Sequence, residues 1–187
     1  ITGMPAIASL MIDMVMEKGR MAVILGASVI VLFLLADFRS FKDTILAVIP
    51  LVIGTVWMLG LMSLAGVKLS MVSFMALPLI IGIGIDDGVH ILHRYRVEGR
   101  GSVPLVIKFT GRAILLTSLT TMIGFGSMAL GVHRGLAALG LTLFLGVGAC
   151  FVSSAFVLPA LLTLAEAVGN DARKSRATAD GHEKPAA

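Results

Sequence analysis

The sequence predicts an all-α transmembrane protein, and three observations lead to that fold class. The chain has 187 residues, of which 57% are hydrophobic and only 14% are charged, and its mean hydropathy is +1.00. A soluble domain is roughly 45–50% apolar and about 25% charged, so this chain carries too much apolar surface for water. Its few charged residues also divide it into long uncharged stretches, as expected of helices that cross a bilayer.

Five apolar stretches have the length of membrane-spanning helices, which need about 20 mainly apolar residues. They lie at residues 20–37, 44–66, 69–93, 110–132 and 136–166. The first is short, but Lys18 and Arg20 can extend to the interface at its end. The last exceeds one crossing and can tilt, and Pro159 can bend it. Together they predict a five-helix transmembrane domain over residues 20–167.

The flanking segments differ in character from the spans. Residues 1–19 place Ile7, Leu10 and Met14 at helical spacing beside polar positions, which predicts an amphipathic lead-in at the outer surface. Residues 168–187 are rich in Ala, Lys, Arg, Asp and Gly, and we expect a disordered tail there. Because the chain opens on Ile1 without the features of a signal peptide, we expect it to be a piece of a longer protein.

Lysine and arginine gather on one side of the predicted helices. If five helices alternate in direction, 11 of the 15 basic residues fall in the first loop, the third loop and the tail, and 4 fall on the opposite side. Cytoplasmic loops are enriched in basic residues. We therefore expect a multi-pass protein of the cell (inner) membrane, with the tail cytoplasmic and the N-terminus of this chain extracytoplasmic.

Charge and cysteine content narrow the function further. The net charge of +4 is explained by basic cytoplasmic loops, so no nucleic-acid partner is expected. The single cysteine, Cys150, excludes an intrachain disulfide and a cysteine metal site, and it lies in an apolar run where a small core residue fits.

Asp86 and Asp87 are the residues that point to chemistry, because they follow an apolar run that begins at Leu69. One aspartate at a helix centre costs about 2.5–3.5 kcal/mol on insertion. Burial and like-charge repulsion both favour the neutral acid, so one or both groups can bind and release a proton near neutral pH. We predict a proton relay in the inner half of the membrane. The alternative is a solvated pair at the cytoplasmic end of the helix.

His90 follows the aspartates by one helical turn and shares their face, so it can pass protons onward. His93 is interpreted as an interfacial side chain bonded to water. A metal site formed by these two histidines and the two aspartates is disfavoured, because adjacent helical side chains diverge by about 100°. No metal is expected.

Gly82, Gly84 and Gly88 flank the aspartates, and small residues of this kind let a second helix approach closely. Hydroxyls on that second helix are candidate partners for the carboxylates. The candidates are Thr117, Ser118, Thr120 and Thr121.

Three segments carry a resemblance to a known family. The run from Gly82 to Asp87 resembles the GxxxD signature of the resistance–nodulation–division (RND) superfamily, including its MMPL-like and hydrophobe/amphiphile exporters and the related sterol-sensing-domain proteins such as Patched. The run from Arg112 to Ser118 is similar to the motif of the family's penultimate helix, which favours Thr117 among the hydroxyls. The opening run from Thr2 to Pro5 resembles the segment that leaves the second extracytoplasmic domain.

The resemblance implies the C-terminal half of an RND-type membrane domain, helices eight to twelve of twelve. It implies a secondary active transporter rather than an enzyme, driven by the proton-motive force, with Asp86 and Asp87 as the relay and Thr117 and His90 assisting. No cofactor is expected beyond protons as the coupling ion. The implied partners are membrane lipid, a hydrophobic or amphiphilic substrate and the N-terminal half of the same protein. A homo-oligomer is left open.

Two other functions stay open at this point. One is a sterol- or lipid-sensing or regulatory membrane module that does not pump, and the other is an accessory subunit for protein export. The aspartate pair lies in the tenth-like helix here, whereas the family's drug pumps carry it in the fourth. That placement favours the MMPL-like and sterol-sensing branches.

Overall fold

The computed structural model describes residues 4–66 and 71–181, and it places side chains for Met14 and for most residues from 17 to 168. The described chain is helical apart from short connections. The elements are α1 (Met4–Phe38), α2 (Phe41–Leu64), α3 (Met71–Glu98), α4 (Val103–Val106), the π-helical turn η1 (Ile107–Gly111), α5 (Arg112–Ala129) and α6 (Arg134–Gly181).

Five helices in the described part of the chain are long and apolar enough to cross a membrane. Their apolar segments are Glu17–Phe38, Phe41–Leu64, Met75–Glu98, Val103–Ala129 and Arg134–Val168. The predicted all-α transmembrane fold class is therefore confirmed. Each apolar segment corresponds to one predicted span, with ends that differ by several residues because the helices continue into polar residues at either end.

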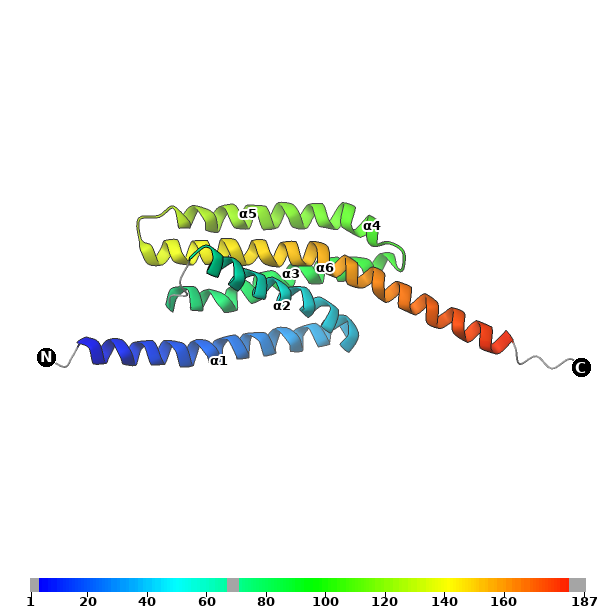
Figure 1. The fold of residues 1–187 in the computed structure, drawn as a ribbon, viewed down its shortest axis with the longest axis horizontal. Coiled ribbons are helices and arrows are strands. Elements are labelled where there is room, and N and C mark those ends of the chain that lie inside the picture. The colour runs from blue at the N-terminus through cyan, green and yellow to red at the C-terminus, as the bar shows by residue number, and fades with distance from the viewer. Residues whose placement is uncertain (1–3, 67–70, 182–187) are drawn as a thin grey trace, which may run out of the picture.

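The long helices run side by side along one axis of the molecule, with α6 in the middle (Figure 1). Helix α6 packs against α5, α2 and α3, and α1 packs on the other side against α3 and α2. The buried core lies where α2, α3 and α6 meet, around Met58, Ile80 and Cys150.

Two glycines make this close packing possible. A Cβ atom at Gly54 of α2 would lie 2.7 Å from Cα of Cys150, and one at Gly146 of α6 would lie 2.7 Å from Cδ1 of Ile80. At Gly54 the near atoms are backbone, so α2 and α6 lie almost backbone to backbone there. At Gly146 the ends of the Ile80 and Met58 side chains fill the space beside α6. Ser153 of α6 adds a hydrogen bond of 2.7 Å to the carbonyl of Pro50 in α2.

One end of the bundle carries most of the described basic residues. At this end α1 and α3 finish and α2 and α5 begin, and we call it the basic end. Its basic residues are Arg39, Lys42, Arg94, Arg96, Arg100, Lys108 and Arg112. Arg39 has left-handed backbone, with φ of 47°, where the chain turns from α1 into α2. Gly99 and Gly101, with φ of 85° and 83°, have left-handed backbone where the chain turns from α3 into α4.

The two flanking segments look different from the sequence expectation. The segment 1–19 is continuous with the first span, since α1 runs unbroken from Met4 to Phe38, although residues 1–3 and the side chains of 4–13 lie outside the described part. Helix α6 continues to Gly181, where a disordered tail was expected from residue 168. The last part of α6 projects past the bundle (Figure 1). Residues 182–187 of the predicted tail lie outside the described residues.

Candidate functional site: the intramembrane aspartates

Asp86 and Asp87 lie near the middle of a span. The apolar segment of α3 runs from Met75 to Glu98, and Asp87 is about half-way along its 24 residues. At 1.5 Å per residue this places the carboxylates roughly 18 Å from the start of the segment.

Asp87 points into the bundle, toward α5. It is only 8% exposed, and Ser118, which is 5% exposed, donates a hydrogen bond to it. The hydroxyl oxygen lies 3.3 Å from Oδ1 and 3.2 Å from Oδ2. A buried carboxylate with a single neutral donor is poorly compensated, because an ionised carboxylate accepts several hydrogen bonds in water.

Asp86 lies on a different face and is open. Its side chain is 68% exposed, and Nε2 of His90 lies 3.4 Å from its Oδ1. Asp86 also lines a groove between α1 and α3, which we call the α1–α3 groove, with a volume of about 500 Å³. The other lining residues are Val29, Ile30, Phe33, Leu34, Gly82, Ile83, Ile85 and Val89. Adjacent carboxylates therefore occupy opposite environments, one buried and one reachable from a largely apolar groove.

The glycines around the pair do not all serve close packing. A Cβ atom at Gly84 would lie 2.7 Å from Sγ of Cys150, and one at Gly88 would lie 3.2 Å from the carbonyl oxygen of Ala47. Gly82 instead faces the α1–α3 groove, and no atom of the described residues lies within 4 Å of its Cβ position. Gly84 thus brings α6 close to α3, and Gly88 brings α2 close, directly beside the aspartates.

Among the hydroxyls of α5, the structure brings Ser118 to the aspartates and leaves Thr117 apart. Thr117 is exposed and donates to the carbonyls of its own helix at Ala113 and Ile114, over 3.3 and 3.0 Å. Thr120 and Thr121 also bond their own helix. In the structure, the buried residues of α5 are Ile114 and Ser118. The sequence signal for Ser118 is weak, because it consists only of a spacing of four residues from the apolar Ile114, which places both on one helix face.

The remaining predicted groups are not assembled into a larger site. His93 is exposed about two turns beyond the pair. Among the residues that the structure describes, no three His, Cys, Asp or Glu side chains gather as ligands for a metal ion. The arrangement can hold and release a proton at the carboxylates, with His90 the nearest imidazole.

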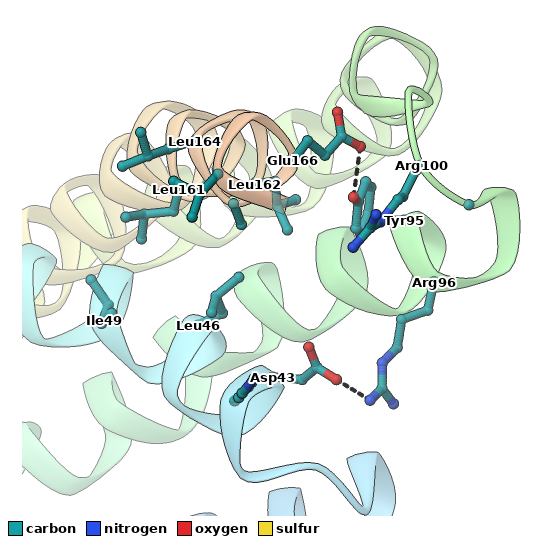
Figure 2. A pocket seen from close by; sticks show the side chains of 14 residues that line it. Asp43, Leu46, Ile49, Tyr95, Arg96, Arg100, Leu161, Leu162, Leu164 and Glu166 are labelled. Carbon is teal, nitrogen blue, oxygen red and sulfur yellow. Dashed lines mark hydrogen bonds and ion pairs between the residues drawn. The ribbon is translucent and has the colours of Figure 1, made fainter. Parts of the chain in front are cut away.

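Two polar connections at the basic end were missed by the sequence reasoning. Arg96 of α3 pairs with Asp43 of α2, donates to the carbonyl of Phe38 over 3.0 Å and lies 4.9 Å from the centre of the Phe38 ring. Tyr95 donates to Oε1 of Glu166 in α6 over 2.6 Å, and the amide of Gly101 donates to the same oxygen over 2.7 Å. Figure 2 shows both carboxylates with their partners. The bonded residues are 53–71 positions apart in the sequence, so no local sequence pattern predicts these contacts.

Comparison with known proteins gives a consistent set of relatives. The sequence model of the MMPL family matches residues 1–181. A membrane protein of Methanocaldococcus jannaschii is 32% identical over 88% of this chain and 44% of its own length. The hopanoid transporter HpnN of Burkholderia multivorans is 26% identical over 71% of this chain and 15% of its own length. Protein patched homolog 2 of Homo sapiens is 34% identical over 57% of this chain and 9% of its own length. The chain spans less than half the length of each of these relatives.

Proposed function

This chain belongs to the MMPL family, and from that membership we propose that it forms the C-terminal half of the membrane domain of a proton-coupled lipid exporter. The observation that carries the proposal is the pair of adjacent carboxylates near mid-span. Asp87 is buried against Ser118, and Asp86 is open to the α1–α3 groove. Intramembrane ionisable residues are typical of proton relays.

The two environments give each carboxylate a distinct role. Asp86 exchanges protons through the groove, and His90, one turn nearer the basic end, is its nearest partner. Asp87 carries the proton that couples to helix movement. When Asp87 is ionised it only accepts from Ser118, and when it is protonated it can also donate. Protonation removes a buried charge and so changes how firmly α3 and α5 are held together.

Coupling to export follows from that change. Secondary transporters built from two related halves rock one half against the other around a site near the bilayer midplane. In this proposal the protonation state of Asp87 biases that movement, and the N-terminal half supplies the opposing surface. Thr117 and Thr120 are exposed on α5, where such a surface can contact them.

The substrate class we propose is a lipid or another hydrophobic or amphiphilic compound. The hopanoid transporters that match this chain are named for a lipid. The α1–α3 groove supports the same class, because eight of its nine lining residues are apolar or glycine. A membrane-embedded apolar groove suits a substrate that arrives from the bilayer.

A second candidate function is lipid sensing without pumping, with the aspartates as structural groups. The observation in favour of this second candidate is the similarity to protein patched homolog 2, which extends over 57% of this chain. The two candidates differ in one property, since only the exporter moves protons in exchange for substrate.

The deciding experiment measures substrate-driven proton flux in proteoliposomes that contain the full-length protein, with a hopanoid as the trial substrate. Asp86→Asn and Asp87→Asn are compared with wild type, and Asp37→Asn serves as a matched control because Asp37 is exposed at the end of α1. Loss of flux in either mid-span variant, with Asp37→Asn unaffected, supports the relay. Wild-type flux in both mid-span variants overturns it, and hopanoid binding without any proton flux favours the sensing function.

A further inference from the structure

A second cavity, of about 790 Å³, opens at the basic end and is separate from the aspartates. It lies between the first turns of α2, the last turns of α3 and the part of α6 near Leu162, and we call it the basic-end pocket (Figure 2). Its volume falls within the roughly 300–1,000 Å³ typical of ligand sites. Neither Asp86 nor Asp87 lines it, so what it binds is independent of the relay proposed above.

The lining of this pocket changes from polar to apolar along the bundle axis. On α2 it begins with Lys42 and Asp43 and continues two turns deeper with Ile49. On α6 it runs from Glu166 back to Leu161 in the same direction. A molecule that fills it needs a polar group at the end of the bundle and an apolar part about 10 Å deeper in the membrane.

The charges at the polar end are not balanced within the protein. Of the acidic groups, Asp43 is engaged by Arg96, and Glu166 accepts from Tyr95 and Gly101. Lys42 and Arg100 also line the pocket, and neither forms an ion pair with a carboxylate among the side chains that the structure describes. Arg100 does act electrostatically on Glu166. With Arg96, three cations and two carboxylates line the pocket, so it carries one net positive charge above an apolar floor.

We propose that the basic-end pocket binds an anionic phospholipid from the adjacent leaflet. Its phosphate pairs with Lys42 and Arg100, and the start of an acyl chain lies along Ile49, Leu161 and Leu164. Basic pockets between transmembrane helices bind anionic headgroups in this way. The apolar floor selects a lipid over a soluble anion, and the surplus of cations selects an anionic lipid over a zwitterionic one.

A bound lipid in this position has a structural consequence. The pocket is formed by three helices that are joined at this end by the Arg96–Asp43 and Tyr95–Glu166 contacts. A phosphate that pairs with Lys42 of α2 and Arg100, just after α3, adds a third connection between the same segments. The lipid is a resident ligand that holds the basic end together, whatever the substrate.

The test uses the full-length protein in phosphatidylcholine vesicles, with a fluorophore attached at Leu164→Cys in a background without other reactive cysteines. Leu164 lines the pocket and is 60% exposed. Brominated phosphatidylglycerol or brominated phosphatidylethanolamine with the same acyl chains is added at equal mole fraction. Contact between the bromines and the fluorophore quenches fluorescence, so the readout reports lipid beside Leu164, and the Lys42 and Arg100 variants test whether that lipid is held by the pocket.

We expect phosphatidylglycerol to quench at about fivefold lower mole fraction than phosphatidylethanolamine, since the lining carries one net positive charge and a basic residue near anionic lipid contributes about 1 kcal/mol. Lys42→Gln with Arg100→Gln should abolish that preference. Lys108→Gln with Arg112→Gln is the matched control, because these residues lie at the same end but outside the pocket, and it should retain the preference.

Four results would overturn the proposal. The first is equal quenching by both lipids in the wild-type protein. The second is a preference that survives the Lys42 and Arg100 changes. The third is protection of the fluorophore from both lipids, which means that another part of the protein covers the pocket. Competition by soluble glycerol phosphate at millimolar concentration also contradicts it, because that result identifies an anion site without a lipid.

Discussion

The hydroxyl of Ser118 in α5 donates to the carboxylate of Asp87 in α3, 3.2 Å from Oδ2 and 3.3 Å from Oδ1. Both side chains are buried. The threonine hydroxyls of α5 instead bond the carbonyls of their own helix, so Ser118 supplies the hydroxyl that reaches the aspartates from α5.

Ser118→Ala should weaken both folding and coupling. It leaves a buried carboxylate without its donor, which costs about 1–3 kcal/mol. We expect a lower free energy of unfolding in detergent and reduced substrate-driven proton flux, and Ser118→Thr should restore part of both because it keeps the hydroxyl. Thr121→Ala is the matched control, since its hydroxyl donates to the carbonyl of Thr117 in its own helix. If Thr117→Ala impairs flux and Ser118→Ala does not, Thr117 rather than Ser118 assists the relay.

Gly84→Ala should destabilise the bundle while Gly82→Ala should not. The added Cβ at Gly84 would lie 2.7 Å from Sγ of Cys150 and 3.0 Å from its Cβ, so α3 and α6 have to separate, at a cost of about 1–3 kcal/mol. At Gly82 the space is open, and alanine gains up to about 1 kcal/mol in helix propensity. Thermal unfolding in detergent measures both changes. Adding Cys150→Ala should recover part of the Gly84→Ala loss, because it removes the sulfur.

Arg96→Gln should cost more stability than Arg94→Gln. Arg96 joins three helices through Asp43, the Phe38 carbonyl and the Phe38 ring, and we expect a loss of about 1–2 kcal/mol. Arg94 pairs with Glu98 on its own helix at 2.5 Å, an exposed pair that contributes about 0.3–0.5 kcal/mol. Denaturation in mixed micelles compares the two variants, and equal losses would show that Arg96 does not hold the basic end together.

The sequence was sufficient to locate the helices, but it did not show which face of each helix is buried. Charged residues interrupt the apolar stretches clearly enough to locate five spans and the aspartate pair. In a membrane helix, however, the face toward lipid is as apolar as the face toward the core. Hydrophobicity therefore does not tell which face of α5 is buried, and Thr117 and Ser118 are adjacent positions about 100° apart. The same reasoning explains why Gly82 was grouped with Gly84 and Gly88 although it faces the groove.

The distribution of basic residues predicts that the basic end faces the cytoplasm. Single cysteines at Lys108, in η1, and at Val132, between α5 and α6, lie at opposite ends of the bundle, and both positions are exposed. A membrane-impermeant maleimide added to intact cells should label Val132→Cys at once and Lys108→Cys only after permeabilisation. The native Cys150 is fully buried and should resist the reagent in both conditions, so it serves as the internal control. Labelling of Lys108→Cys in intact cells would invert the orientation, and the lipid in the basic-end pocket would then come from the outer leaflet of that membrane.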